Sequence, residues 1–417
     1  MVTEIENLSM LVGPEFQLVE KGCVEIVDGV IRSIADRSNN PSVSSNKEPK
    51  VKLNGKGLLA IPGLINAHVH IGDSIAKDAG VGLPFNELVH PIYGLKTKIL
   101  NEATREQISQ SITQTAQDML ATGITTFADF REGGLDGVQL AQSSLRDLRI
   151  RAVLLGRTSY HFSEDEVSDE GKGLDEPKVA ELQKTLDLCN GVGLSGPNEY
   201  TSHAMKQISE IARTRKKLLA IHAAESTESR SFSLEHFGTT EVARLLKYMR
   251  PDFLVHLTNS TNEEMQAIAE ANIPVVCCPR ANSMLGIGFP PIVSLLQMGA
   301  NVSLGTDNVM INSPDMFREM DYTSKMIRAV HRSPAIINSK DILKMATINA
   351  ANALGVGSKI GSLEEGKLAD IVFLDLKAAN LINSKDITSS VVHRARAENV
   401  KCVMFGGEIV HGSIPKF

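Results

Sequence analysis

Two histidines close the first long apolar run of the chain, which reads Leu58-Leu-Ala-Ile-Pro-Gly-Leu-Ile-Asn-Ala-His68-Val-His70. On a β-strand the side chains at positions i and i+2 lie on one face, so both imidazoles can reach a single cation at the carboxyl end of the strand. Neutral imidazole is a good ligand for zinc, iron and manganese. Because the pair alone also fits an ordinary polar strand edge, a metal site requires further ligands elsewhere in the chain.

Three more polar residues follow apolar runs of their own. The runs are Leu218-Leu-Ala-Ile-His222, Phe253-Leu-Val-His256 and Asn301-Val-Ser-Leu-Gly-Thr-Asp307. A histidine or an aspartate in a buried strand costs free energy unless it is paired or coordinated. Because all three occupy the same position relative to their strands, we expect them to share one site with His68 and His70. The alternative is a set of unrelated buried polar residues.

The segments between these runs alternate between helical and strand-like patterns. Helices are predicted near residues 105–121, 137–147, 179–189, 203–215, 240–248, 262–271 and 292–298, and strands at 58–70, 124–130, 151–156, 191–194, 218–222 and in the runs that end at His256, Cys278 and Asp307. The strands have apolar centres without alternation, which is typical of parallel strands covered by helices. The pattern predicts an α/β protein with a (β/α)8 TIM-type barrel, whose active site lies at the carboxyl ends of the strands.

The two ends of the chain differ from the middle. A turn at Asp28-Gly29 separates two short strand-like segments, and residues 366–375 and 400–410 again resemble strands, the latter with a Gly-Gly turn. Residues 38–50 are rich in Ser, Asn and Pro and predict an exposed loop. We expect a small β-sandwich domain formed by residues 1–58 plus 362–417, and a barrel domain formed by residues 59–361.

Composition excludes several classes of partner. The chain has 417 residues, 42% hydrophobic and 22% charged, with a formal charge of -6, which disfavours a nucleic acid polymer but not a single nucleobase. No apolar run approaches the length of a membrane span, and acidic residues stand where a secretory leader would be basic, so we expect no membrane partner and a cytoplasmic location. The cysteines are few and lie mostly in apolar segments, so we interpret them as core packing in a reducing compartment: Cys23, Cys189, Cys277, Cys278 and Cys402.

Several motifs together resemble the amidohydrolase superfamily, in particular its cytosine deaminase and triazine chlorohydrolase branch. The resemblance covers nearly the whole chain and rests on Pro62-Gly-Leu-Ile-Asn-Ala-His-Val-His70, His222-Ala-Ala-Glu225, Pro279-Arg-Ala-Asn-Ser283, Leu304-Gly-Thr-Asp307 and Gly361-Ser-Leu-Glu-Glu-Gly-Lys-Leu-Ala-Asp370.

The resemblance implies that His68, His70, His222 and Asp307 hold one divalent metal ion. Three imidazoles and one carboxylate leave a coordination position open for water, as catalytic sites do. A bound metal lowers the pKa of that water from about 16 toward about 7 and makes hydroxide available at neutral pH. We expect zinc, and iron and manganese suit the same ligands. Members with two metals bridge them through a lysine at the fourth strand. Here that strand reads Gly191-Val-Gly-Leu-Ser-Gly-Pro-Asn198-Glu199, without a lysine, so one metal is expected.

The resemblance also implies roles for the remaining polar residues of the site. Glu225 would act as general base toward the water and then as general acid toward a ring nitrogen, with an ordinary surface glutamate as the alternative. His256 would orient the hydroxide, and ligation of a second metal is the rival role. Asp307, besides ligating, would carry a proton to the departing amine.

The predicted function is hydrolytic deamination, with release of ammonia from an amino-substituted heterocycle such as a purine, pyrimidine or pterin. The alternatives are hydrolysis of a cyclic amide or of a chloro-triazine, and a barrel that binds without catalysing. Residues 71–101 form a long connection that predicts a wall of the substrate site. Arg131, Asn198 and Asn282 are candidate substrate contacts, each of which also fits a salt bridge or cap at the barrel rim.

Asn198 bears on the substrate class. Nucleoside deaminases of this branch commonly have a histidine after the Gly-Pro of the fourth strand, where this chain has Asn198. That departure favours a free base, a pterin or another small ring as the heterocyclic partner. The resemblance leaves a monomer and a homo-oligomer both open, since assemblies of identical subunits are common in the family.

Overall fold

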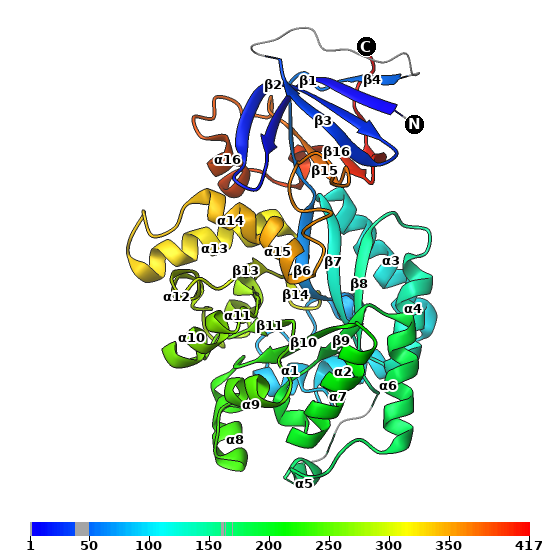
Figure 1. Ribbon diagram of the computed structural model, residues 1–417, viewed down its shortest axis with the longest axis vertical. Helices are drawn as coiled ribbons and strands as arrows, with labels where there is room; N and C mark the ends of the chain where they lie inside the picture. Colours follow the sequence, from blue (N-terminus) through cyan, green and yellow to red (C-terminus); the bar gives the residue numbers. More distant parts are fainter. Residues whose placement is uncertain (1, 38–49, 160–161, 163, 169) are drawn as a thin grey trace.

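The computed structural model describes residues 2–37, 50–159, 162, 164–168 and 170–417. It consists of one sheet built from the chain termini and, below it in Figure 1, a larger sheet surrounded by helices. The exposed loop that we expect at residues 38–50 falls almost wholly outside the described residues.

The larger sheet has nine parallel strands in the order β13-β12-β11-β10-β9-β8-β7-β6-β14. β13 and β14 stand at opposite ends of this path, although only Gly305 and Thr306 separate them in the chain. The amide of Gly305 donates to the carbonyl of Cys277 at 3.0 Å, and that of Thr306 donates to the carbonyl of His68 at 3.0 Å. The sheet therefore curls so that the connection from β13 to β14 bridges its two ends, which is consistent with a TIM-type barrel. Its strands are β6 (Leu64–His70), β7 (Ile124–Arg131), β8 (Arg151–Gly156), β9 (Gly191–Leu194), β10 (Leu218–Ala223), β11 (Phe253–His256), β12 (Val275–Cys277), β13 (Val302–Leu304) and β14 (Asp307–Asn308).

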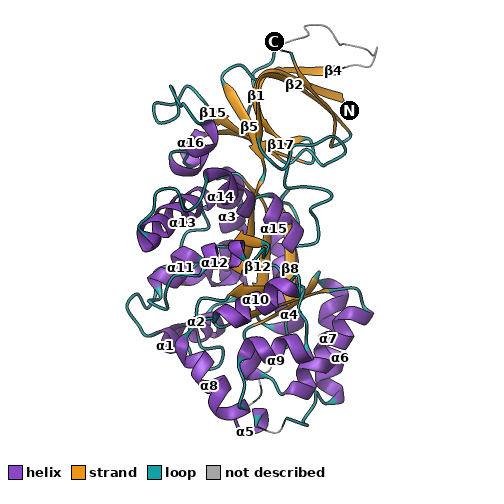
Figure 2. Cartoon of the chain, turned by 60° about the vertical axis from the view of Figure 1, so that its left-hand side comes forward, coloured by secondary structure: helices purple, strands orange, loops and turns teal. Residues whose placement is uncertain are grey.

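The helices expected between the strands are present and cover the outside of this sheet (Figure 2). They are α3 (Arg105–Ala121), α4 (Gly134–Leu145), α6 (Glu176–Leu188), α7 (Ser202–Thr214), α9 (Glu241–Tyr248), α10 (Asn262–Glu270) and α12 (Ile292–Gln297). Most begin at a side chain that caps the first free amides, and α3 has a complete capping box between Thr104 and Gln107. None of the helices in the described part of the chain is long and apolar enough to cross a membrane.

The other helices occupy the connections between these elements and the region after the last strand. They are η1 (Ile71–Ala76), α1 (Phe85–Val89), α2 (Leu95–Glu102), α5 (Glu164–Val167), η2 (Pro197–Glu199), α8 (Thr227–Phe237), α11 (Pro279–Met284), α13 (Met316–His331), α14 (Ser339–Met345), α15 (Ile348–Ala353), α16 (Ile387–His393) and η3 (Ala397–Asn399).

The two termini build one sheet together, as their β-rich patterns predict. Its strands run β17-β16-β15-β5-β1-β2-β3, with β4 paired to β1. Ile5, Leu8, Phe373 and Met404 belong to a buried cluster of this sheet, separate from the barrel core. Its strands are β1 (Val2–Val12), β2 (Gln17–Val27), β3 (Val30–Asp36), β4 (Lys50–Asn54), β5 (Leu58–Pro62), β15 (Ile371–Asp375), β16 (Val400–Phe405) and β17 (Glu408–Gly412).

The single strand expected at residues 58–70 is divided in the structure. β5 pairs with β1 and β15 in the terminal sheet, and only β6 enters the barrel. Gly63 separates them: its amide donates to the carbonyl of Asp370 at 2.8 Å, and a β-carbon there would lie 2.1 Å from Thr125 Oγ1. Residues 59–62 therefore lie in the terminal sheet rather than in the barrel. The sequence hides this break because both strands are fully buried and the apolar run is continuous.

Candidate active site

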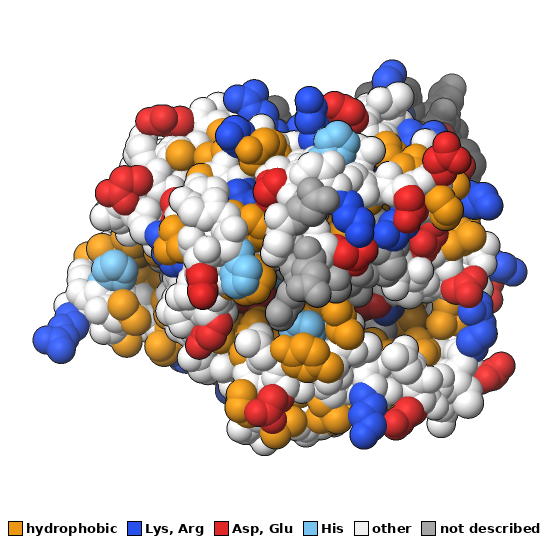
Figure 3. All heavy atoms as spheres, turned by 90° about the horizontal axis from the view of Figure 1, so that it is seen from below, with side chains coloured by type: hydrophobic (Ala, Val, Ile, Leu, Met, Phe, Trp, Pro, Cys, Tyr) orange, Lys and Arg blue, Asp and Glu red, His pale blue; other side chains and the backbone are white. Residues whose placement is uncertain are grey.

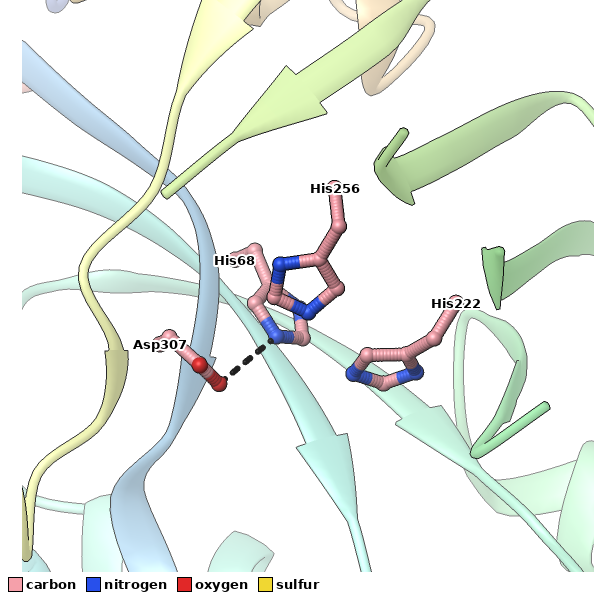
Figure 4. A group of neighbouring side chains, drawn as sticks. All are labelled: His68, His222, His256 and Asp307. Atoms are coloured by element: carbon pink, nitrogen blue, oxygen red, sulfur yellow. Dashed lines mark hydrogen bonds and ion pairs between the residues drawn. The ribbon is translucent and has the colours of Figure 1, made fainter. Parts of the chain in front are cut away.

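The side chains singled out in the sequence meet at the carboxyl ends of the barrel strands. His68, His222, His256 and Asp307 come from four different strands and point toward one another (Figure 4). One ligand atom of each lies within 4.8 Å of those of the others, and all four side chains are buried. Among the described residues, this is the one cluster of histidine, cysteine and carboxylate groups that could hold a metal.

His70 borders this cluster without belonging to it, whereas the sequence predicts it as a ligand and places His256 outside the ligand set. Its Nε2 lies 3.6 Å from Asp307 Oδ1. Its Nδ1 lies 2.8 Å from Glu132 Oε1 and 3.1 Å from the carbonyl of Phe130. Because both of these partners are acceptors, the proton is on Nδ1 and the lone pair of Nε2 points toward the cluster. His256 is the last residue of β11 and pairs with Ala223, the residue after His222 in β10, which places it beside the cluster.

The imidazoles of the site are held in the neutral form. Burial lowers the pKa of His68 to about 3 and holds the pKa of His222 well below its usual value. His222 Nδ1 donates to the carbonyl of Leu194 at 2.7 Å, which leaves Nε2 free as a ligand atom. Burial alone would raise the pKa of Asp307, but the hydrogen bond from His68 and the surrounding imidazoles outweigh it and lower that pKa. The donor set is therefore three neutral nitrogens and a carboxylate, the forms in which these side chains bind metals.

The cluster fits a divalent cation on two further observations. His256 Nε2 is buried and has no hydrogen-bond partner among the described residues, a state that costs roughly 1–3 kcal/mol. A cation, or a water molecule held by one, would satisfy that lone pair. Four ligands about 2.1 Å from an ion in a tetrahedron are about 3.4 Å apart, so ligand atoms that lie within 4.8 Å of one another would have to move closer together to bind one.

The backbone around the site is strained. Ala224, His256, Leu257 and Asp307 all have positive φ, at 46°, 77°, 53° and 60°. Residues other than glycine adopt this region at a cost of about 1–3 kcal/mol each, and they concentrate at functional sites. These turns aim the polar side chains into the mouth of the barrel.

Glu225 directly follows Ala224, one of these residues with positive φ, and lies beside the cluster. Its Oε1 is 3.3 Å from His256 Nε2. Burial, with the charges of Asp307 and Glu241 adding to it, holds the pKa of Glu225 well above its usual value. Asn259 Nδ2 donates to the backbone carbonyl of Glu225 at 2.7 Å and fixes the turn. The carboxyl group can therefore take up and release a proton next to the ligand atoms.

A cavity of about 430 Å³ opens onto the cluster. His70, His222, Glu225 and Asp307 lie on its inner side. The long connection after β6 supplies one wall, as expected, through Phe85, Val89, Ile92, Tyr93 and Lys96. Figure 3 views this end of the molecule, where the surface is hollowed and hydrophobic side chains gather around the hollow.

The three candidate substrate contacts are placed differently. Asn198 lines the cavity and donates from Nδ2 to the carbonyl of Ser229 at 2.8 Å. Asn282 and Arg131 are buried and are not part of the cavity lining. Asn282 contacts His256 Nδ1 at 3.3 Å and donates to Thr258 Oγ1 at 3.0 Å. The structure thus brings Asn198 to the cavity, and places the other two where they support other residues of the site.

Two further glutamates support the site. Glu132 directly follows β7, at a strand end that the sequence offers for a substrate contact or a salt bridge of the barrel rim, and it contacts His70. Glu241 accepts hydrogen bonds from the amide of Ala224 at 2.9 Å and from Ser229 Oγ at 2.5 Å. In the sequence it is an ordinary acidic residue in the first turn of a helix, which gives no hint of burial. All five cysteines are buried and free, as expected.

The amidohydrolase family model matches residues 59–410, most of the chain. The chain belongs to the amidohydrolase family. It is therefore a hydrolase acting on carbon-nitrogen bonds other than peptide bonds, and the resemblance drawn from the motifs is confirmed. A relative from Methanothermobacter thermautotrophicus is 35% identical over 408 residues, which cover 97% of this chain and 98% of that protein. The 5-methylthioadenosine/S-adenosylhomocysteine deaminase of Pyrococcus furiosus is 28% identical over 422 residues, 97% of this amidohydrolase and 94% of that protein.

Solved structures agree in fold. A zinc-bound adenosine deaminase from Xanthomonas campestris superposes with a TM-score of 0.83 at 22% identity, covering 98% of this chain and 92% of that one. The zinc complex of atrazine chlorohydrolase from Arthrobacter aurescens gives a TM-score of 0.84 at 20% identity, covering 98% and 95%.

Proposed function

We propose that this amidohydrolase is a metal-dependent deaminase that releases ammonia from an amino-substituted heterocycle. The observation that carries the proposal is the position of Glu225: a carboxyl group, 17% exposed, beside a cluster of three histidines and an aspartate, facing a cavity of about 430 Å³. Relatives that align with nearly the whole chain are named deaminases of 5-methylthioadenosine and S-adenosylhomocysteine, which supports the reaction class.

We propose His68, His70, His222 and Asp307 as ligands of one divalent ion, with zinc as the metal. When bound, the ion supplies a water molecule acidified toward a pKa of about 7. The proton on His70 Nδ1 is fixed by Glu132, which supports Nε2 as the ligand atom. The zinc-bound deaminase and chlorohydrolase of the same fold support the choice of metal.

The residues around the ion would then divide the proton transfers. Glu225 takes a proton from the attacking water and delivers it to the ring nitrogen beside the carbon under attack. His256, 3.3 Å from Glu225, orients that water. Asp307 passes the second proton of the water to the exocyclic amino group, so that the carbon-nitrogen bond breaks with ammonia as the leaving group. The balance is one water consumed, one carbonyl formed on the ring and one ammonia released.

The cavity supports a single ring system as the reacting part of the substrate. Its lining combines the proton-transfer groups with the apolar side chains of Phe85, Val89, Phe162 and Phe232. Flat apolar surfaces with a few polar groups are typical of sites that bind aromatic ligands. Asn198 lies at the cavity edge as the proposed substrate contact.

The test is ammonia release from a panel of purines, pyrimidines, pterins and adenosine derivatives, with protein reconstituted separately with zinc, iron and manganese. Glu225→Gln, reconstituted in the same way, is the matched control. Turnover of at least one amino-heterocycle by the wild type, and its loss in the variant, is the expected result. Chloride release from chloro-triazines or opening of cyclic amides without any ammonia would replace the deaminase assignment. Absence of every hydrolytic activity in metal-loaded protein would leave a binding protein instead.

A further inference from the structure

One buried lysine stands among the carboxylates that surround the candidate metal site. Lys96 lies in α2, part of the long connection after β6, and only 8% of its side chain is exposed. Its Nζ lies 2.6 Å from Glu132 Oε1 and 3.6 Å from Asp73 Oδ2. A buried ammonium group costs several kcal/mol unless it is paired, so these two carboxylates are what keeps it there.

The first of these carboxylates, Glu132, contacts the proposed metal ligand His70. The Glu132 oxygen that contacts Lys96 also accepts the hydrogen bond from His70 Nδ1, at 2.8 Å. Its other oxygen accepts from Arg131 Nη2 at 2.7 Å. Because Glu132 is fixed from both sides, the ring of His70 is fixed as well, with Nε2 directed toward Asp307.

The second of these carboxylates, Asp73, contacts β14, the strand of the proposed ligand Asp307. Asp73 is fully buried and accepts hydrogen bonds from Asn308 Nδ2 at 2.7 Å and from the amide of Met310 at 3.1 Å. Asn308 is the residue after Asp307, and both pair with β6. Asp73 therefore anchors the short strand β14 directly beside Asp307.

We propose that Lys96 is a positioning residue of the metal site, whose ammonium group joins Glu132, which orients His70, to Asp73, which anchors the strand of Asp307. This inference rests on the metal site of the proposed function. It gives α2 a role beyond lining the substrate cavity, because α2 then also helps to hold the two proposed metal ligands His70 and Asp307.

The charges show what loss of the ammonium group would do. Among the described residues, Lys96 is the cation within ion-pair distance of Asp73, while Arg131 remains for Glu132 and contacts Asp129 at 3.7 Å. Without Lys96, Asp73 would have no cation within ion-pair distance among the described residues, and Glu132 and Asp129 would share the guanidinium group of Arg131. Asp73 and Glu132 would lose their common partner, and His70 and Asp307 would no longer be held at a fixed separation.

The experiment measures zinc affinity directly, by competition with a chromophoric chelator in substrate-free protein. Lys96→Met is compared with Lys98→Met, which changes an exposed lysine of the same helix. Replacing a partner behind a ligand typically costs 10- to 100-fold in metal affinity, so Glu132→Gln should fall in that range and Lys96→Met should weaken zinc binding about tenfold. Lys98→Met should bind zinc as the wild type does, and Lys96→Arg should recover most of the affinity.

A double variant tests whether the two residues act along one path. Lys96→Met combined with Glu132→Gln should lose less zinc affinity than the two single losses together predict, because residues of one network are not additive. If circular dichroism shows that Lys96→Met does not fold, Lys96→Gln takes its place, since it removes the charge and keeps a hydrogen-bonding group.

Three outcomes would overturn the inference. Unchanged zinc affinity with a raised KM would make Lys96 a substrate contact instead. Fully additive losses in the double variant would show that Lys96 and Glu132 act independently. A wild-type chain that binds neither zinc, iron nor manganese would remove the metal site itself and this inference with it, a result distinguishable from the first two because those require metal-binding wild-type protein.

Discussion

Glu241 makes the stability of this amidohydrolase depend on pH in a defined window. The side chain is 3% exposed, and burial raises its pKa from 4.5 to about 7, although hydrogen bonds from Ser229 and Ala224 oppose the shift. A carboxyl group whose pKa is higher in the folded state retains its proton there while the unfolded chain has already lost it. The contribution of Glu241 to stability therefore falls as the pH rises from about 4.5 to about 7, and its full penalty is present above pH 7.

The size of the effect follows from the shift. A difference of about 2.5 pKa units corresponds to roughly 3 kcal/mol of unfolding free energy between the two ends of the window. Glu241→Gln cannot ionise, but its amide can still accept from Ala224 and donate to Ser229 Oγ. The variant should therefore lack this part of the pH dependence, up to about 1.4 kcal/mol per pH unit.

The assay is urea denaturation of metal-free protein at several pH values between 4.5 and 7.5, with Glu235→Gln as a control at an exposed position of α8. We expect the stability of the Glu241→Gln variant to fall less steeply with pH than that of the wild type, whereas the control should follow the wild type. Parallel curves for wild type and Glu241→Gln would refute the reasoning, because they would show that Glu241 is ionised throughout the window in both states.

Three further predictions concern the site itself. Glu225→Gln should bind zinc as the wild type does, as measured by elemental analysis. Its kcat should fall about 10²- to 10⁴-fold, the usual contribution of a general acid-base group. Undiminished turnover would show that Glu225 takes no part in the proton transfers. Asp307→Ala should lose the rise in Tm that zinc produces in the wild type. In the wild type, zinc at a free concentration of 100 times its Kd adds about 2.7 kcal/mol to the unfolding free energy. An equal rise in Tm in the variant would mean that Asp307 is not a ligand. Gly305→Ala would place a β-carbon 2.7 Å from His68 Cβ and 2.9 Å from the backbone of His68, so it should cost about 1–3 kcal/mol in unfolding free energy and weaken zinc binding. A variant that matches the wild type in both measurements would contradict the close approach of the Gly305 backbone to β6.

The sequence predicts the parts of this site that depend on strands. His222, His256 and Asp307 each follow an apolar run, and parallel strands of a barrel bring their carboxyl ends together whatever the loops do. The contacts that hold the proposed ligands in place could not be predicted, because they depend on how segments far apart in the sequence pack together. Lys96 and Asp73 lie in one connection and Glu132 follows another strand, and nothing in their spacing indicates that they meet around His70.

The same reasoning explains two features that strand periodicity leaves undetermined. Whether His70 or His256 enters the central cluster depends on ring orientation and on shifts of an ångström between strand ends, which strand periodicity does not determine. The break at Gly63 leaves no trace in hydrophobicity, since β5 and β6 are both fully buried and share one core cluster through Leu59, Ile61, Leu64 and Val69. Burial of Glu241 is likewise a product of tertiary packing rather than of the helix on which it lies.

The direct passage from β5 into β6 through Gly63 makes this stretch intolerant of changes in length. Because neighbouring side chains of a strand point to opposite faces, deleting or inserting one residue between the two sheets would rotate His68 and His70 away from the barrel interior unless one sheet gave up its pairing. Homologous chains that retain the metal site should therefore differ in the lengths of their surface loops while keeping the distance from the terminal sheet to these histidines constant.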